Sequence, residues 1–247
     1  MKYEFTGEVK VEFGIEFKRI RALVAIAALG VSVGQLGGWI EKEGNLSQYD
    51  NAWVYGDARV YGNAHVYGNA RVYGNTQVYG NTQVSGDARV YGNARVYGNA
   101  QVYGNTQVSG DARVYGNAHV YGNTQVSGNA HVYGNARVYG NARVYGNTQV
   151  SGDAWVYGNA RVYGNARVYG DAQVSSMMIV ATRSDGYMFH CCQTKEGAPV
   201  IIAGCRYFNF TEARDHWTKT RGGTPIGEES LALVDHLERM AKIKGWC

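Results

Sequence analysis

Residues 93–98 read Asn-Ala-Arg-Val-Tyr-Gly, and this six-residue pattern repeats twenty-one times without an insertion from Asn51 to Ser176. A period of six is neither the 3.6 residues of a helical turn nor the simple alternation of an isolated strand. Repeats this short and regular are typical of solenoids, in which each unit buries its apolar face against its neighbours. The pattern therefore predicts the architecture of half of this 247-residue chain.

Each six-residue unit, called a hexapeptide below, has a defined inside and outside. Valine occupies the same position in all twenty-one hexapeptides, from Val54 to Val174, and the residue two before it is always alanine or threonine. Because residues two apart in a strand point to the same side, we expect these two positions to face a core. The residue between them and the tyrosine after valine then face outward. Gly-Asn or Gly-Asp predicts the corner, since these residues tolerate a left-handed backbone.

One valine and one small residue per hexapeptide fill only a narrow core, and a triangular coil of three hexapeptides meets this constraint. The sequence thus predicts a mainly β protein: a three-sided parallel β-helix of about seven coils, with an N-terminal cap and a small C-terminal α+β module. A flattened coil of twelve residues stays open as an alternative. The phrase Gln-Val-Ser-Gly recurs from Gln83 to Gln149 at spacings of 24, 18 and 24 residues, which are not all multiples of eighteen.

Composition divides the chain into residues 1–50, a capping segment, residues 51–176, the β-helix, and residues 177–247, an α+β domain. The net charge of +4 lies on the repeat, which is a mild surplus compared with the dense basic stripe of a dedicated DNA-binding protein. The four cysteines form no CxxC pair, which indicates reduced thiols and a cytoplasmic protein. The apolar run at residues 22–29 is too short to span a bilayer, so we expect no membrane partner.

The N-terminal segment carries signals for both strand and helix. Residues 2–17 interleave aromatic and β-branched residues with glutamates, which predicts strands around a glycine turn. Ile20, Leu23, Val24 and Ala27 fall on one helical face, which predicts a helix over residues 17–29. Leu36, Ile40 and Leu46 then predict an irregular first coil that leads into the repeat.

The C-terminal segment predicts strands followed by helices. We expect strands at 178–182 and 187–194 around a turn at Ser184-Asp185-Gly186, and a third strand at 200–210. Thr211 is the expected cap of a short helix that ends near Trp217. Thr224-Pro225 should open a final helix, since proline is favoured in a first turn. The apolar stripe of that helix is Leu231, Val234, Leu237 and Met240.

Arginine gathers on two of the three outward ladders that an eighteen-residue coil would create. One ladder contains Arg71, Arg89, Arg143 and Arg161, and the other contains Arg59, Arg95, Arg113 and Arg167. Guanidinium groups beside tyrosine and glutamine are typical of sites for anionic small molecules or single-stranded nucleic acid. These eight arginines are therefore candidate ligand-binding residues, although a merely solvated surface would have the same composition.

Tyrosine follows valine in most hexapeptides, so tyrosine ladders should run along the rod. Tyrosine, arginine and tryptophan are the residues that most often anchor protein interfaces. We therefore take one such ladder as the candidate oligomer interface. It consists of Tyr61, Tyr79, Tyr97, Tyr115 and Tyr133.

No constellation in the sequence predicts catalysis. His65, His119 and His131 occupy the same outward position as arginine and glutamine, which indicates solvated residues. His190 and Cys191 are adjacent on a predicted strand and should point to opposite faces. Neither a metal-ligand spacing nor a phosphate-binding loop is present. We expect no enzyme, no metal and no cofactor.

The pairing of each valine with a small residue two positions earlier, as in Val54 with Ala52, resembles the hexapeptide-repeat, left-handed parallel β-helix of many bacterial acyltransferases. That resemblance implies left-handed coiling and a trimer, and it makes an acyltransferase-like enzyme one alternative. Two departures are the tyrosine after valine and the absence of loops or proline in the repeat. Residues 36–41 with 45–47 resemble the lead-in of uncharacterised "polymer-forming" repeat proteins of bacteria and phages.

These observations favour a non-enzymatic binding and assembly protein, of the kind a phage or prophage encodes as an accessory. Its expected partners are further copies of itself, as a dimer or trimer, and a host protein or a small anionic ligand in the host cytoplasm. Nucleic-acid binding through the arginine and tyrosine ladders is the second alternative.

Overall fold

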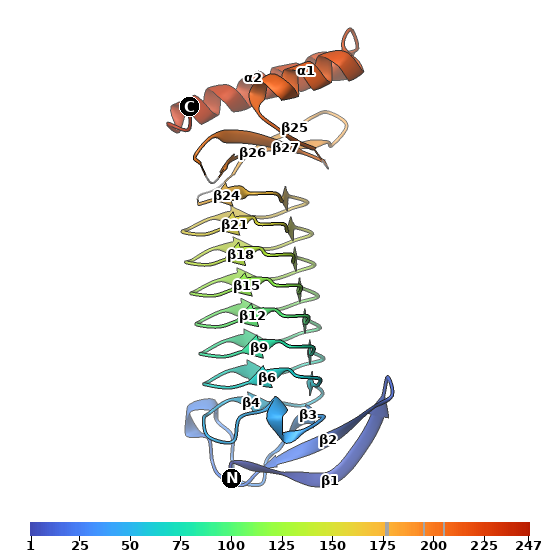
Figure 1. Cartoon of the computed structure of the whole chain (residues 1–247), viewed down its shortest axis with the longest axis vertical. Helices are drawn as coiled ribbons and strands as arrows, with labels where there is room; N and C mark the ends of the chain where they lie inside the picture. Colours follow the sequence, from blue (N-terminus) through green and yellow to red (C-terminus); the bar gives the residue numbers. More distant parts are fainter. Residues whose placement is uncertain (176–177, 195, 205) are drawn as a thin grey trace.

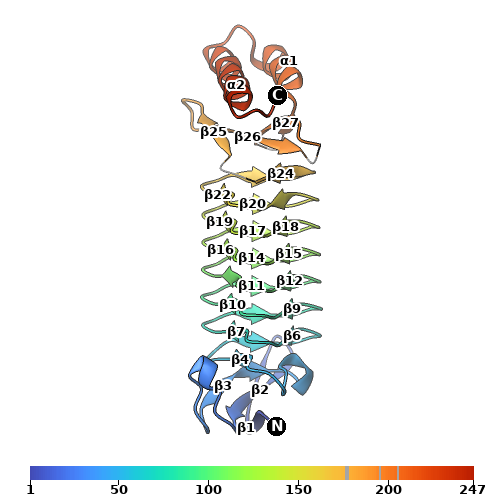
Figure 2. The ribbon, with the colours of Figure 1, turned by 90° about the vertical axis from the view of Figure 1, so that its left-hand side faces the viewer.

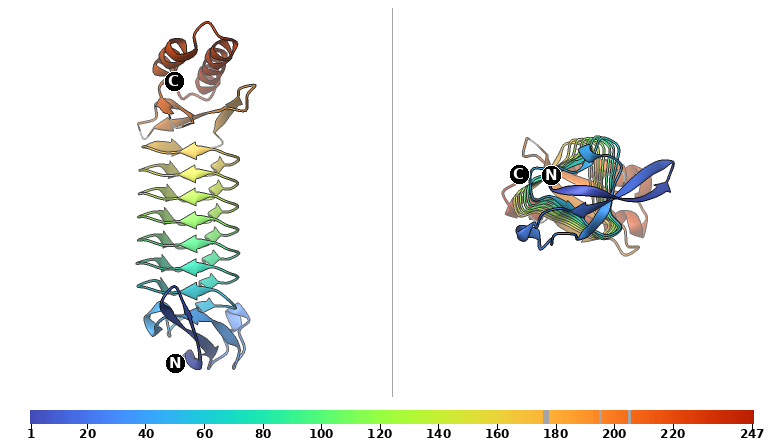
Figure 3. Two further views of the ribbon diagram at one scale, coloured as in Figure 1. Left: turned by 90° about the vertical axis from the view of Figure 1, so that its right-hand side faces the viewer. Right: turned by 90° about the horizontal axis from the view of Figure 1, so that it is seen from below.

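A computed structural model describes residues 1–175, 178–194, 196–204 and 206–247 of the chain. The repeat forms a straight rod of stacked coils, with the N-terminus at one end and the C-terminus at the other (Figure 1). Seen along the rod from the N-terminal end, the coils superimpose on one another (Figure 3). The predicted boundary between residues 176 and 177 lies outside the described residues.

The rod has three sheets of parallel strands, which stack in columns along its length (Figure 2). The first face contains β4 (Trp53–Val54), β7 (Arg71–Val72), β10 (Arg89–Val90), β13 (Gln107–Val108), β16 (Gln125–Val126), β19 (Arg143–Val144) and β22 (Arg161–Val162). The second face contains β5 (Arg59–Val60), β8 (Gln77–Val78), β11 (Arg95–Val96), β14 (Arg113–Val114), β17 (His131–Val132), β20 (Gln149–Val150) and β23 (Arg167–Val168). The third face contains β6 (His65–Val66), β9 (Gln83–Val84), β12 (Gln101–Val102), β15 (His119–Val120), β18 (Arg137–Val138), β21 (Trp155–Val156) and β24 (Ala172–Val174).

The coil has eighteen residues. Arg95 pairs with Arg113 and Val96 with Val114, and the same shift of eighteen relates the other strand pairs of the repeat. The three-sided parallel β-helix of about seven coils is therefore confirmed, and the alternative coil of twelve residues is wrong. The irregular spacing of Gln-Val-Ser-Gly does not reflect the coil length.

The inside of the rod is a column of valines flanked by small residues. Val96, Val114 and their equivalents are fully buried, as are alanines such as Ala94. Threonine replaces alanine without leaving its hydroxyl unpaired at Thr76, Thr82 and Thr106, where Oγ1 donates to the carbonyl three residues earlier at 2.7 Å. This is the inward position that the sequence predicts.

Glycine is required at the corners of the coils for two reasons. Gly98 has a φ of 78°, which is costly for any residue with a Cβ. A Cβ there would also lie 2.9 Å from the backbone nitrogen of Gly116 in the next coil. The asparagines beside these glycines form exposed amide ladders, in which Asn99 Nδ2 donates to Asn117 Oδ1 at 3.0 Å. The corner is thus as strictly stacked as the strands.

The N-terminal segment extends the second face. β1 (Tyr3–Glu12) and β2 (Ile15–Ala22) form an antiparallel hairpin, and β2 pairs with β3 (Leu36–Ile40). β3 runs parallel to β5, with Ile40 opposite Val60, and Leu46 bridges to Val66. Two short 3₁₀ helices, η1 (Ala27–Leu29) and η2 (Glu43–Asn45), complete the segment. The predicted irregular first coil is confirmed for Ile40 and Leu46, which are buried, whereas Leu36 is exposed.

The helix predicted over residues 17–29 is wrong. The segment forms β2 and η1, and Leu23 and Val24, expected on the apolar face of the helix, are exposed. Ile20 is buried as expected, but it faces the core of the rod from a strand, and Phe17, three residues earlier, is buried on the opposite side against Tyr61. Pairing with β1 on one side and β3 on the other overrides the local helical pattern.

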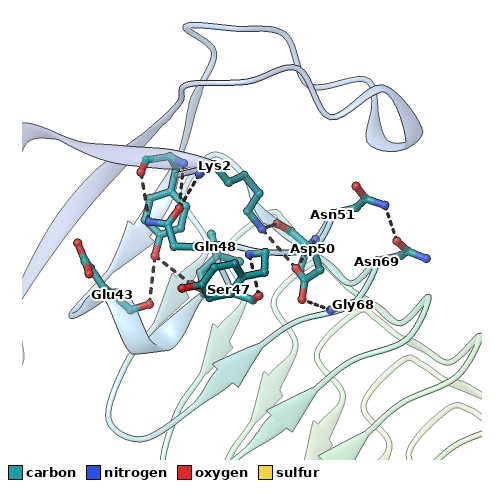
Figure 4. A network of polar contacts seen from close by, with 12 residues as sticks. Lys2, Glu43, Ser47, Gln48, Asp50, Asn51, Gly68 and Asn69 are labelled. Atoms are coloured by element: carbon teal, nitrogen blue, oxygen red, sulfur yellow. Dashed lines mark hydrogen bonds and ion pairs between the residues drawn. The ribbon is translucent and has the colours of Figure 1, made fainter.

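A network of polar contacts joins the chain terminus to the first coil (Figure 4). Lys2 is buried, and its Nζ donates to the carbonyl of Ala52 at 2.7 Å and lies 3.4 Å from Asp50 Oδ1. The other oxygen of Asp50 accepts from the N–H of Gly68 at 2.7 Å. Burial lowers the pKa of Lys2, which the Asp50 carboxylate partly opposes. The network closes the open end of the rod.

Trp53, predicted on an outward ladder, is instead fully buried. Tyr3 covers its ring edge-on, with centroids 6.3 Å apart. The first coil therefore has a covered outer face, because the N-terminal segment wraps it.

The C-terminal segment adds a sheet and two helices. β25 (Ile179–Thr182), β26 (Met188–Thr194), β27 (Pro199–Ala203) and β28 (Arg206–Phe208) precede α1 (Phe210–Arg221) and α2 (Pro225–Ile243). β26 pairs antiparallel with β24, which extends the third face of the rod. One side of this sheet, with Cys192 and Ile202, packs on the core of the rod. Its other side, with Phe189 and Ile201, packs against the helices.

Two local predictions for this segment need correction. The strand expected over 200–210 is two antiparallel strands, β27 and β28, because the chain reverses after Ala203. Asn209 caps α1 instead of Thr211, since its side chain accepts from the N–H of Glu212 while Glu212 bonds back to the N–H of Asn209. The hairpin of β25 and β26 is confirmed, and so is the start of α2 at Pro225.

Cys191, Cys192 and Cys247 are free thiols, and Cys205 lies outside the described residues. In the part of the chain that the structure describes, no helix is long and apolar enough to cross a membrane.

Candidate functional site

The coil register decides which of the eight candidate arginines stand together. Strand pairing places Arg71 beside Arg89 and Arg143 beside Arg161 on the first face. On the second face, Arg95 lies beside Arg113, while Arg59 and Arg167 each have a glutamine as neighbour. The candidates thus form three pairs and two single residues, not two continuous stripes.

Two of these arginines are engaged by the N-terminal segment. Arg59 Nε lies 2.8 Å from Glu12 Oε2, and this ion pair, together with Lys10, lowers the pKa of Glu12. Arg71 Nη2 donates to the carbonyl of Ala28 at 3.1 Å. Both side chains hold the cap to the rod, which makes them poor candidates for ligand binding.

The five candidate tyrosines form the longest stack of rings among the described residues. Neighbouring centroids from Tyr61 to Tyr133 lie 4.8–5.0 Å apart, and the ring planes agree within 5°. Phe17 closes the N-terminal end of the stack edge-on against Tyr61. Burial, together with its neighbour Tyr79, raises the pKa of Tyr61 to about 12. The structure therefore brings all five residues together as one flat aromatic strip, called the second-face stack below.

The stacking also limits what the tyrosines can bind. Within a stack, each inner ring has its two faces covered by its two neighbours, so its edge and hydroxyl group are what remains for a partner to contact. Bases of a nucleic acid stack on open ring faces. Such faces exist only where a stack ends.

Serine takes the place of tyrosine at four positions of the ladders before the last hexapeptide. These are Ser85, Ser109, Ser127 and Ser151. The last of these ends the second-face stack, because Ser151 follows Tyr133 in the column. A cleft of about 280 Å³ lies there, lined by Tyr133, Gln149, Ser151, Arg167, Tyr169 and Gly204. In the sequence these serines entered only through the spacing of Gln-Val-Ser-Gly, and their effect on the surface was missed.

A second cleft of about 190 Å³ adjoins the first. It lies between the last coil and the C-terminal sheet and shares Arg167 and Gly204 with its neighbour. Its other lining residues are Asn165, Gly186, Tyr187, Met188, His190 and Ile202. The two clefts together are called the junction cleft below.

His190 is the buried polar group of the junction cleft. It is 4% exposed, and its Nε2 has no hydrogen-bond partner among the described residues. Burial lowers the pKa of His190, while a hydrogen bond with the backbone of Ile202 acts in the opposite direction. Cys191 packs against the helices on the other side of the sheet, and burial raises its pKa to about 12. The structure thus separates the two side chains, as their adjacency on a strand predicts.

The three histidines of the repeat lie outside these clefts. His65 is exposed, and His119 and His131 are half-buried on the outer faces. Burial, and in each case a nearby arginine, lowers the pKa of His119 and of His131. The described residues include no group of three acidic, histidine or cysteine side chains that could hold a metal ion.

The three-sheet rod and its hexapeptides define the chain as a β-solenoid repeat protein. Its repeat is similar to a family model described as "YdcK Beta solenoid repeat". The matches cover residues 52–68, 64–80, 82–98, 88–104, 106–122, 136–152, 154–166 and 160–176. No curated protein matches the chain.

Proposed function

We propose that this chain is a non-enzymatic binding and assembly protein that self-associates through the second-face stack. The observation that supports this most strongly is the uninterrupted stacking of Tyr61 to Tyr133. Rings already fixed by their neighbours lose little conformational freedom when a partner covers them, and this lowers the entropic cost of association. Arg95 and Arg113 flank the strip and add the second residue type that is typical of interface anchors.

Two features support a binding role over catalysis. The coils carry no inserted loop, and the clefts described above are lined by none of the three repeat histidines that an acyltransferase-like enzyme would use. The resemblance to hexapeptide-repeat acyltransferases supports left-handed coiling and a trimer, with a dimer as the alternative. The lead-in at residues 36–47 supports a phage or prophage accessory protein that sequesters a host protein or a small anionic ligand in the cytoplasm.

Nucleic-acid binding is a second candidate, favoured by the in-register pairs of exposed arginines on two faces. Contact would be made with phosphates and not by stacking of bases, because ring faces inside the stacks are covered. Such binding would weaken steeply with salt. An affinity for DNA or RNA that is equal at low and moderate salt would exclude this candidate.

Self-association is tested by replacing tyrosine with serine, the residue that the repeat itself uses at this position. The triple variant Tyr79→Ser, Tyr97→Ser, Tyr115→Ser removes the centre of the second-face stack. The matched control, Tyr103→Ser, Tyr121→Ser, Tyr139→Ser, removes a stack of the same kind from the third face. We expect the native chain and the control to sediment as a dimer or trimer, and the second-face variant to sediment at the monomer mass of 27.1 kDa.

Two results would contradict this assignment. A native chain that sediments as a monomer at micromolar concentration would exclude self-association. If both triple variants keep the native mass, the interface lies elsewhere on the molecule.

A further inference from the structure

The second-face stack ends at a vacancy of one ring. Tyr115 covers one face of Tyr133 at a centroid distance of 4.9 Å, and Ser151 stands where the next ring would lie. Because successive strands are about 4.8 Å apart, one missing ring leaves a space of roughly 10 Å along the column. Stacked aromatic rings have centroids about 4.5–7 Å apart, so this space suits one planar ring. The cleft of about 280 Å³ occupies this position.

The cationic side chain of Arg167 lines the space left by the missing ring. Arg167 is exposed, lines both parts of the junction cleft, and has the neutral Gln149 as its neighbour in the ladder. Its guanidinium forms no ion pair among the described residues, unlike that of Arg59. An anionic group bound between the two parts of the cleft would therefore meet an available guanidinium, which binds phosphate and carboxylate well.

The backbone supplies a further donor at the same place. In the coil below, the N–H of Gln149 donates to the carbonyl of Ala166 at 2.9 Å. β23 is the last strand of the second face on the C-terminal side. By the same geometry the N–H of Arg167, a residue that lines the junction cleft, points beyond this last strand, and no backbone acceptor for it is found in the described part of the chain. An anion there would satisfy it.

His190 forms the polar end of the second part of the cleft. Leaving a buried nitrogen unpaired is costly, and in native structures such a group is rare. His190 shares its side of the sheet with Ile202, which packs on the rod, so its ring faces the last coil and not the helices. A ligand hydroxyl or N–H would give Nε2 the partner it lacks.

We propose that the junction cleft binds a small ligand with a planar heteroaromatic ring, polar hydroxyl or N–H groups and one anionic group, which is the chemistry of a nucleoside monophosphate. The ring continues the second-face stack above Ser151, the anion contacts Arg167, and a hydrogen-bonding group reaches His190. This inference rests on the proposed function and specifies the chemistry of the small anionic ligand named there. It does not depend on self-association, because Tyr133 is its only contribution from the stack.

The test uses AMP and UMP as probes, with adenosine, uridine and inorganic phosphate for comparison, in calorimetric titrations of the full chain. We expect one nucleotide per chain, and weaker binding of the nucleoside and of phosphate alone. Ser151→Tyr fills the vacancy with the residue that the ladder holds elsewhere and should weaken nucleotide binding at least about tenfold, or 1.4 kcal/mol. Ser127→Tyr fills a vacancy on the first face and should leave the affinity unchanged.

Two further variants separate the anion and hydrogen-bond contacts. Arg167→Gln, which uses the residue at position 149, should weaken AMP about tenfold and adenosine less than about twofold, because only the anion contact is lost. Arg137→Gln, at the same outward position on the third face, is its matched control. His190→Phe should weaken the nucleoside as well as the nucleotide. Failure of both nucleotides to bind at millimolar concentration, or equal binding by Ser151→Tyr and Ser127→Tyr, would overturn the proposal.

The same titration in the triple variant Tyr79→Ser, Tyr97→Ser, Tyr115→Ser distinguishes this site from self-association. We expect a monomeric variant that still binds one nucleotide, since Tyr133, Arg167 and His190 are intact. Loss of association with retained binding would leave this inference standing, and retained association without binding would leave only the assembly role.

Discussion

The rod and the C-terminal module both consist largely of β-strands, but their cores are organised differently. In the rod, each valine contacts equivalent valines eighteen residues away, so every coil has nearly the same environment. In the module, Phe189, Trp217 and Leu237 come from three different elements and meet only once. The rod can therefore vary at an outward position without consequence for its core, whereas the module depends on single contacts.

Alkaline pH should have the largest effect on the rod. Burial raises the pKa of stacked tyrosines, to about 12 for Tyr61, against an ordinary value of about 10 in the unfolded chain. A raised folded-state pKa stabilises the fold below pH 10, and this stabilisation is lost as the pH rises through 12. We expect the strand signal in circular dichroism to disappear within this window, together with a rise of tyrosinate absorbance. Tyrosinate formation with an unchanged strand signal would contradict the dependence of the rod on its stacks.

Leu237→Ala should destabilise the module by about 2–5 kcal/mol. It removes a fully buried side chain and leaves a cavity that the surrounding core residues fill only in part. The transition of the module should then separate from that of the rod in calorimetry. Ile243→Ala, at the exposed end of the same helix, is the control and should have little effect. If Leu237→Ala lowers the melting of the rod equally, the shared sheet of β26 and β27 couples the two regions into one unit.

Glycine substitutions at the corners should lower the free energy of unfolding by a smaller amount. The comparison of two such variants measures how closely the corners of adjacent coils pack. Gly98→Ala places a Cβ in a left-handed conformation and 2.9 Å from the next coil. Gly164→Ala has a similar φ, 69°, but no described atom within 4 Å. The left-handed conformation costs about 1–2 kcal/mol at either position, so the difference between the two variants reports the contact. Equal losses in urea denaturation would show that the corners of adjacent coils do not constrain one another.

The sequence was most informative where the structure is periodic. The inward valine, the small residue two before it and the corner glycine follow from strand alternation and turn chemistry, and each is found as predicted. The tyrosine and arginine ladders follow once the coil has eighteen residues. The number eighteen was the weaker inference, because a hexapeptide contains no local signal for how many units close a coil.

Prediction failed where distant segments meet. Phe17 and Ile20 have a helical spacing, yet β1 and β3 hold them in a strand. Trp53 occupies an outward position, yet Tyr3 buries it. The junction cleft was missed because its lining comes from residues 133–169 and 186–204, which are brought together only when the C-terminal sheet continues the third face.

The sequence alone determined the hexapeptide, its inside and outside, and the ladders of repeated side chains, because these depend on backbone geometry within six residues. The tertiary structure decided the closure of the coil, the wrapping of the first coil by the N-terminal hairpin, and the meeting of Ser151, Arg167 and His190 at the end of the rod. Those features depend on contacts between segments far apart in the chain, where side-chain packing and backbone pairing compete and no local pattern records the outcome.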